Sequence, residues 1–227
     1  MGKRQESRDR IERQIVELGR RQLATTGAAA LSVRAIAREL GMVSSAVYRY
    51  VASRDELLTL LLVDAYSELA DAVDEARAAH AGEAWRTQLM AMARSVRRWA
   101  IGEPASWALL YGSPVPGYHA PAELTIGPGT RVVGALFDVI AAGLAAGDVP
   151  TGGLEISTSM AADFDAIRTE FAFGGNDAAV AKCFLSWATL VGAISLEVFG
   201  QYGADTLSDP DALFELQLQL LMAGLTG

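Results

Sequence analysis

The chain has 227 residues and a formal net charge of −8, and because 51% of its residues are hydrophobic it is not expected to be disordered. A single cysteine, Cys183, excludes a disulfide framework and a cysteine-based zinc cluster within the chain. The N-terminus is polar, and no uninterrupted apolar run reaches the length of a membrane span, so we expect a soluble cytoplasmic protein without cofactor, metal or membrane partner.

The charge is divided unevenly along the chain. Residues 1–54 contain eleven Lys and Arg against five Asp and Glu, whereas residues 55–227 contain eight against twenty-two. This division indicates that the first quarter binds a polyanion and that the remainder is kept away from it, although a charged stretch can also be only a solvated face. Basic residues near the N-terminus are either disordered or reach the adjacent groove of DNA: Lys3, Arg4, Arg8 and Arg10.

Three helices are predicted before residue 52. Apolar residues recur at spacings of three and four from Arg10 and predict an amphipathic helix that Gly27 ends. Ser32 is expected to cap a short second helix, which Gly41 ends by adopting a positive φ. Ser44 begins a third helix, so helix, glycine turn and helix follow one another as in a helix-turn-helix motif.

The second helix of such a motif enters the major groove, and here its N-terminal residues are small enough to approach base edges. Ala46 can contact a thymine methyl group, and Arg34 could form a bidentate pair of hydrogen bonds with guanine. Tyrosine hydroxyls and Arg54 are expected to bind phosphates. The expected DNA contacts are Arg34, Val43, Ser44, Ser45, Ala46, Tyr48, Tyr50 and Arg54.

Structural roles for these residues remain open at this stage. Tyr48 and Tyr50 could be core aromatics, but two residues that are two apart on a helix cannot share a face. Val47 and Val51 already form the face of this helix that is expected to be buried. Ser44 could serve only as a helix cap.

The rest of the chain is also predicted to be helical. Ser53 and Glu56 form a capping-box pattern that opens a long helix to about Ala79. The Pro- and Gly-rich segment 112–129 is too long for an ordinary connection and is either an ordered flap or a mobile gate. Further helices are expected over residues 83–102, 104–111, 124–146, 155–173, 177–201 and 209–225.

The stretch LSVRAIARELGMVSSAVYRYVASRDELL (Leu31–Leu58) resembles the DNA-binding signature of the TetR family of bacterial transcriptional regulators. The resemblance implies an all-α homodimer, with a three-helix DNA-binding domain over residues 1–52 and a larger ligand-binding and dimerisation domain over residues 53–227. Tyr50 stands where the family often has a histidine, and Val51 where it often has a phenylalanine.

A weaker resemblance concerns the stretch SWATLVGAISLEVFGQYG (Ser186–Gly203). It is similar to the C-terminal domain of the TetR subgroup named for a Trp-His-Gly signature. Trp187 and Gly192 fit the signature, but Val191 stands where the histidine belongs.

Two C-terminal helices, 177–201 and 209–225, have the composition of an association surface. The first has a large apolar face beside a strip of small residues, and the second is apolar around more than half its circumference. We expect a four-helix dimer interface, with packing inside one chain as the alternative. The expected interface residues are Phe184, Trp187, Val191, Gly192, Leu213 and Leu221.

The remaining helices combine large apolar side chains with isolated polar ones, as small-molecule pockets do. Any one of these residues could equally belong to the core. The expected ligand-binding residues are Trp99, Trp107, Tyr111, His119, Phe137, Met160, Phe164 and Arg168.

An enzyme is not expected. His80 and His119 are far apart in sequence, Cys183 has no nearby base, and there is no Gly-rich phosphate loop, nucleophile elbow or metal-ligand spacing. The prediction is a repressor that binds a double-stranded, palindromic DNA operator and releases it when an unidentified small, largely apolar effector binds. The alternatives are a dimeric DNA-binding protein without an effector and, less favoured, an enzyme for a small apolar substrate.

Overall fold

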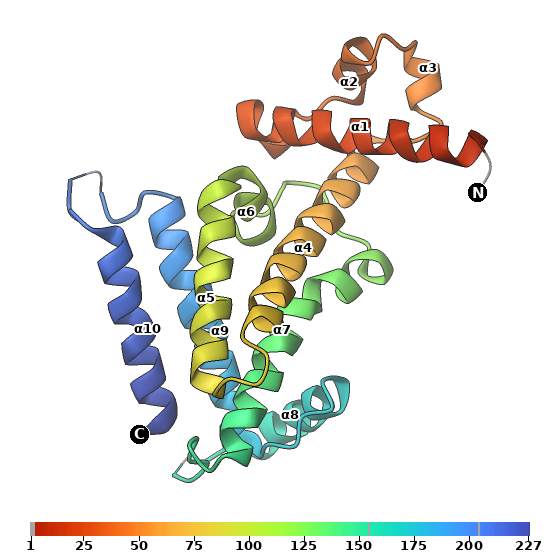
Figure 1. Cartoon of the computed structure of the whole chain (residues 1–227). Coiled ribbons are helices and arrows are strands. Elements are labelled where there is room, and N and C mark those ends of the chain that lie inside the picture. Colours follow the sequence, from red (N-terminus) through yellow and green to blue (C-terminus); the bar gives the residue numbers. More distant parts are fainter. Residues whose placement is uncertain (1–2, 154, 204) are drawn as a thin grey trace. The chain divides into compact units, whose positions relative to one another are not determined.

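The fold is all-α, as expected. This computed structural model describes residues 3–153, 155–203 and 205–227, and over these residues it contains helices and no strand (Figure 1). In chain order the helices are α1 (Lys3–Thr26), the 3-10 helix η1 (Ala28–Ala30), α2 (Val33–Glu39), α3 (Ser44–Val47), α4 (Arg54–Ala79), α5 (Trp85–Gly102), α6 (Pro104–Tyr111), α7 (Ala122–Ala145), α8 (Thr158–Glu170), α9 (Asp177–Val198) and α10 (Pro210–Thr226).

The chain divides into two compact units. The first unit contains the chain up to Glu68 together with Gly102–Gly129, and the second contains Leu69–Ile101 and Thr130–Gly227. This division differs from the domain boundary expected between residues 52 and 53. Part of α4 and the whole of α6 belong with the N-terminal helices, because they pack against them.

The first unit is built around a core shared by α1, α2, α3 and the N-terminal half of α4, which together we call the head (residues 3–68). In Figure 1, α1 runs across the N-terminal end of α4. Gly19 permits this crossing, because a Cβ atom there would lie 3.1 Å from Leu61 and 3.3 Å from Leu57. The most deeply buried residues of this core include Ile15, Ile36, Val47, Val51, Leu57 and Leu58.

The predicted helix ends in the head are confirmed with one adjustment. The Ser32 hydroxyl accepts a hydrogen bond from the first turn of α2 at 3.3 Å, and Gly41 has a φ of 64°. The Ser53 hydroxyl accepts from the Glu56 backbone N–H at 3.0 Å. The Glu56 carboxylate completes the cap by accepting from the N–H of Ala52, rather than from Ser53 as in a regular capping box.

Two element boundaries differ from the expected ones. α1 already begins at Lys3, and the side chains of Lys3 and Arg4, expected in a basic arm, lie outside the described residues. The segment 112–129 is irregular only up to Pro121. The N–H groups of Leu124 and Thr125 both donate to the Pro121 carbonyl, so α7 starts early and continues through Pro128.

In the second unit, α9 packs beside α10 and α8, and α5 is tied to α9 and α10 by ion pairs. Arg94 binds Glu215 at 2.7 Å, and Arg97 binds both Glu197 and Asp211 at 2.6 Å. The hydrogen bond to Glu197 raises the pKa of the Arg97 guanidinium above its usual value. These pairs connect α5 to α9 and to α10.

By length and composition alone, α7 and α9 are long and apolar enough to cross a membrane. Core helices of soluble proteins meet the same criterion. Within the second unit α9 packs against α8 and α10, as a core helix does.

Candidate nucleic-acid interface

The tip of α3 is the exposed part of the helix-turn-helix. Val43, at the N-cap, is 72% exposed, and Ser44 and Ser45 are exposed beside it. Ala46, expected to meet a thymine methyl group, is instead buried at 9% exposure, because the inner face of this single-turn helix packs on the core. The surface left for base edges therefore comes from Val43, Ser44 and Ser45.

The two tyrosines after α3 differ in their surroundings. Tyr48 is 39% exposed, as expected for a residue that reaches a phosphate. Tyr50 is half-buried against the core of the head, and the Arg8 guanidinium lies 5.7 Å from its ring centroid. Val47 and Val51 are fully buried, as predicted.

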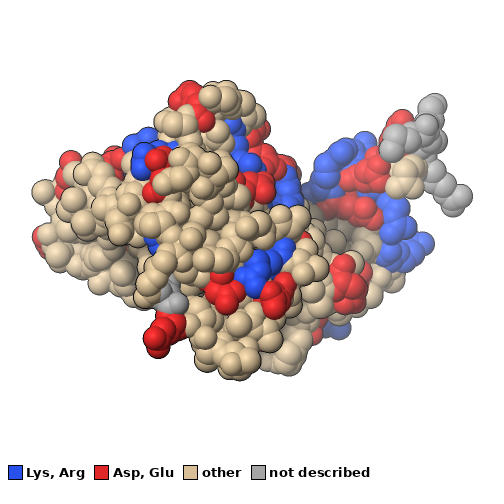
Figure 2. Space-filling view, turned by 90° about the horizontal axis from the view of Figure 1, so that it is seen from below, with Lys and Arg blue, Asp and Glu red and all other residues tan. Residues whose placement is uncertain are grey.

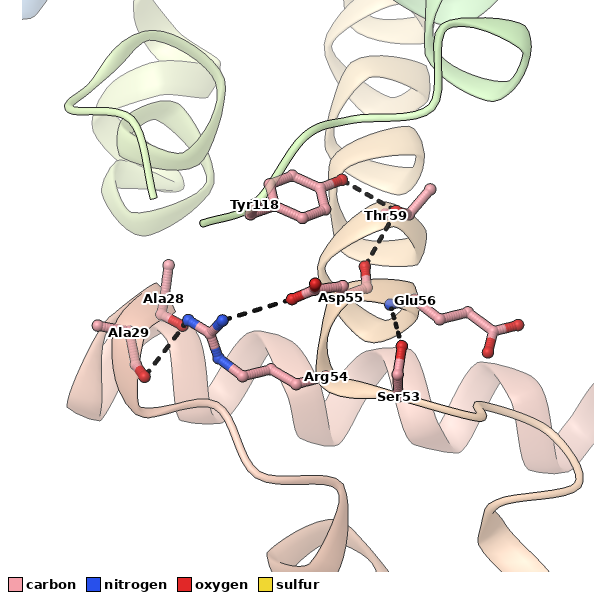
Figure 3. A network of polar contacts seen from close by, with 8 residues as sticks. All are labelled: Ala28, Ala29, Ser53, Arg54, Asp55, Glu56, Thr59 and Tyr118. Carbon is pink, nitrogen blue, oxygen red and sulfur yellow. Dashed lines mark hydrogen bonds and ion pairs between the residues drawn. The ribbon is translucent and has the colours of Figure 1, made fainter. Parts of the chain in front are cut away.

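Arg54 is bound within the head (Figure 3). Its Nη2 atom donates to the carbonyl oxygens of Ala28 at 3.0 Å and Ala29 at 3.4 Å. Its Nη1 atom lies 3.5 Å from the Asp55 carboxylate, and its Nε is buried without a partner among the described residues. This geometry favours a structural role over the expected phosphate contact, because η1 presents its carbonyls to the first turn of α4.

The other arginines of the head fall into two groups. Those on α1 that have ion-pair partners are Arg8 with Glu12, Arg20 with Asp64 and Glu68, and Arg21 with Glu39. By contrast, five arginines are exposed and form no ion pair with any described residue: Arg10 and Arg13 on α1, and Arg34, Arg38 and Arg49 further along the chain. Sequence reasoning singled out Arg34 for DNA but not Arg38 or Arg49, although all three lie in or beside the helix-turn-helix.

Elsewhere, most basic side chains are paired with acidic ones, and acidic groups are in excess. Figure 2 shows one face of the molecule, on which blue groups stand beside red ones and broad tan areas carry no charge. Ion pairs such as Arg131 with Asp71 at 2.8 Å account for such neighbours in the second unit. Unpaired arginines close to an exposed helix tip are therefore the feature of the head that suits a polyanion.

Known proteins resemble this chain over both units. The family model described as "Bacterial regulatory proteins, tetR family" matches residues 15–61, and "Tetracyclin repressor-like, C-terminal domain" matches residues 89–221. The HTH-type transcriptional regulator Rv1816 of Mycobacterium tuberculosis is 63% identical over 223 residues, which are 98% of this chain and 95% of the relative. Its counterpart Mb1846 of Mycobacterium bovis is equally similar. The chain belongs to the TetR family.

Solved structures share the fold of this TetR-family chain. The regulatory protein SCO4313 has a TM-score of 0.78 and 33% identity, covering 98% of this chain and 100% of its own. FadR from Bacillus subtilis, solved in complex with stearoyl-CoA, has a TM-score of 0.65, covering 93% of this chain and 97% of its own. At 14% identity, the likeness to FadR shows the fold alone.

Family membership makes this TetR-family chain a DNA-binding transcriptional regulator and not an enzyme, as predicted. A regulator that binds DNA acts inside the cell. Cys183 is buried on α9, and burial raises the pKa of its thiol to about 12, so the side chain is a neutral apolar group.

The residues expected to bind ligand in this TetR-family regulator fall in both compact units. In the first unit, Trp107 is fully buried, its ring centroid lies 4.4 Å from that of Tyr111, and His119 is exposed. Burial raises the pKa of Tyr111 above its usual value. These three residues therefore do not share one environment.

In the second unit, Phe137 and Phe164 are buried in aromatic clusters. Phe137 stacks on Phe171 with centroids 4.8 Å apart, and Phe164 stacks on Phe184 at 6.1 Å. Three other expected ligand residues lie outside these aromatic clusters. Trp99 is half-buried, Met160 is 44% exposed, and Arg168 forms ion pairs with Asp165 and Asp177. These ion pairs hold the Arg168 guanidinium between α8 and the start of α9.

The expected dimer residues lie on α9 and α10, but the most exposed apolar residues there are others. Phe184 and Gly192 are exposed, whereas Trp187, Val191, Leu213 and Leu221 are half-buried. Four leucines outside the expected interface set are 38–64% exposed: Leu185 and Leu196 on α9, and Leu216 and Leu220 on the helix whose apolar character the sequence had indicated. An apolar groove of about 300 Å³ lies between α9 and α10 and includes Leu185, Leu220 and Leu221.

Proposed function

We propose that this TetR-family regulator is a repressor, which binds a palindromic operator as a homodimer and releases it when a small, largely apolar molecule binds. The observation that carries the proposal is the exposed tip of α3, together with exposed arginines on α2 and just after α3 that form no ion pair with a described residue. Val43, Ser44 and Ser45 have the size and exposure to approach base edges, and serine hydroxyls can donate to or accept from several bases.

The phosphate contacts come from residues around this tip. Tyr48 is exposed, and Arg34, Arg38 and Arg49 are free to neutralise phosphates. Each neutralised phosphate releases counterions, so operator affinity should fall steeply as salt rises. Selection from a random duplex library would identify the operator, and a two-fold symmetric consensus would support the dimer. Failure to enrich any duplex at low salt would overturn the proposal.

The homodimer is supported by the apolar surface of α9 and α10. Leu185 and Leu220 are each 64% exposed, and exposed leucines of this kind on adjacent helices are costly to leave in water. Pairing α9 and α10 with the same helices of a second chain would cover them. Two helix-turn-helix motifs on a palindromic operator bind half-sites about 34–36 Å apart. Light scattering should give the mass of a dimer, and a monomer at micromolar concentration would contradict this part.

The effector is supported by aromatic side chains of the second unit and by a fold relative. Two of the expected ligand residues in this unit are accessible, since Trp99 is half-buried and Met160 is exposed. The same unit contains stacked phenylalanines. FadR from Bacillus subtilis, with the same fold, was solved with stearoyl-CoA, which has a long apolar chain. Effector coupling of about 1–3 kcal/mol would weaken operator binding roughly 5- to 150-fold.

The test is displacement of a labelled operator by stearoyl-CoA, with coenzyme A and stearate as separate controls for its polar and apolar parts. Release by stearoyl-CoA or stearate, but not by coenzyme A, would support an apolar effector. Release by coenzyme A alone would show that the polar part is recognised instead. Retention of the operator with all three would favour a DNA-binding dimer that does not respond to this ligand class.

A further inference from the structure

A segment distant in sequence completes the core of the head. Residues 102–129 belong to the first unit, and α6 packs against α1. Leu109, Val115 and Tyr118 contact the buried core that also contains Val47 and Leu57. The position of the helix-turn-helix therefore depends on contacts from the segment between α6 and α7.

A tight turn sets the direction of Tyr118. The Tyr118 N–H donates to the Val115 carbonyl at 3.1 Å, and Gly117 has a φ of 77°. Pro116 and Gly117 occupy the two central positions of this turn, where a type II turn favours proline followed by glycine. The turn directs the half-buried Tyr118 ring toward α4 (Figure 3).

The hydrogen bonds of Thr59 determine which hydroxyl donates. Thr59 is buried at 5% exposure, and its Oγ1 donates to the Asp55 backbone carbonyl at 3.0 Å. A threonine hydroxyl has a single proton, and a carbonyl oxygen can only accept. The Tyr118 hydroxyl, 2.9 Å from Thr59 Oγ1, must therefore be the donor in the second bond.

The bond between Tyr118 and Thr59 lies close to Arg54, which binds the carbonyls of η1 from the start of α4. Thr59 and Asp55 are bonded within the first turns of α4, and Arg54 next to Asp55 donates to the carbonyls of Ala28 and Ala29. Those carbonyls lie immediately before α2. Figure 3 shows these contacts as one network around the start of α4. The network reaches from the segment before α7 to the entry of the helix-turn-helix.

We propose that Tyr118 is a positioning residue for DNA binding, acting through its hydrogen bond to Thr59. The bond holds residues 112–121 against the first turns of α4 and thereby fixes the placement of α2 and α3. Tyr118 contributes to operator affinity without contacting DNA. The proposal relies on operator binding by the head and not on any effector.

The test is a double-mutant cycle with Tyr118→Phe and Thr59→Val. The probe is the duplex that the wild-type chain selects from a random library, and the readouts are its dissociation constant and the midpoint of thermal unfolding. Each single variant should bind this duplex roughly 2- to 10-fold more weakly, as expected for loss of one hydrogen bond. The double variant should be no weaker than either single variant, because both remove the same bond.

Matched variants separate positioning from general destabilisation. Thr59→Ser keeps the accepting oxygen and should restore affinity to that of the wild type. Tyr202→Phe is the control tyrosine, because Tyr202 is half-buried in the second unit and its hydroxyl accepts one hydrogen bond from Gln217 at 3.1 Å. It should bind as the wild type does. Affinity for an unrelated duplex should be unchanged in all variants, since no phosphate contact is removed.

Three results would overturn the proposal. Tyr118→Phe could bind the selected duplex as tightly as the wild type does. The effects of the two single variants could multiply in the double variant. The unfolding midpoint could fall with operator affinity unchanged at a temperature where every variant is folded, which would make the bond purely structural. If the wild-type chain itself selects no duplex, operator binding fails instead, which is a separate outcome.

Discussion

The variant Arg54→Ala distinguishes a structural role of the Arg54 guanidinium from a role in binding DNA phosphate. Its bond to the Ala28 carbonyl, at 3.0 Å and partly buried, is charge-assisted and worth about 1.5–3 kcal/mol. The contacts to Ala29 and Asp55, at 3.4 and 3.5 Å, are long and exposed and add little. Truncation also removes the buried, unpartnered Nε, whose burial opposes folding, so we expect the net loss from Arg54→Ala to fall below that range, at about 1 kcal/mol.

Thermal unfolding and salt dependence measure the two roles separately. A loss of about 1 kcal/mol should lower the unfolding midpoint by about 2–4 °C in a chain of this size. The slope of the logarithm of operator affinity against the logarithm of salt concentration should not change, because no phosphate contact is lost. Loss of a phosphate contact would instead reduce this slope by about 0.9 per phosphate.

The matched control is Arg49→Ala, because Arg49 is exposed and has no ion-pair partner among the described residues. It should reduce the salt slope and leave the unfolding midpoint unchanged. If Arg54→Ala reduces the slope while the midpoint stays at the wild-type value, the structural assignment of Arg54 is wrong.

Three further predictions follow from the exposed and buried positions described above. Tyr48→Phe should weaken operator binding by about 2- to 10-fold in an anisotropy titration without lowering the unfolding midpoint, and a large drop in that midpoint would make Tyr48 a core residue. Leu220→Arg should give monomers by light scattering while the neighbouring exposed Gln219→Arg stays dimeric; equal masses would place the interface elsewhere. Gly143→Ala should lower the free energy of unfolding by about 1–3 kcal/mol in urea, because its Cβ would overpack the site, and an unchanged midpoint would refute the tight packing. In the folded chain that Cβ would lie 2.9 Å from the Trp85 ring.

Local sequence signals predicted the head well. Ser32 and Ser53 cap helices because short hydroxyl side chains satisfy the free N–H groups of a first turn, and Gly41 takes the positive φ that other residues resist. The burial of Val47 and Val51 followed from helical spacing in the same way. These properties depend on neighbours within a few residues of one another.

The same signals were less reliable where contacts come from distant residues. Ala46 has the size of a base-reading residue, but packing on the core of the head buries it. The Pro- and Gly-rich composition suggested a flap or gate over residues 112–129, overlapping a helix expected from residue 124, whereas hydrogen bonds to the Pro121 carbonyl start α7 at Ala122. On α10, periodicity indicated an apolar helix but could not say that Leu220 is more exposed than Leu221.

By itself the sequence determined an all-helical chain, the helix-turn-helix and its family, because caps, turns and periodicity act over short distances. Tertiary structure alone decided that Arg54 binds the carbonyls of Ala28 and Ala29 and that the Tyr118 hydroxyl donates to Thr59. These partners are 25 to 59 residues apart, so only the packing of α4 against η1 and the segment before α7 brings their atoms within hydrogen-bonding distance.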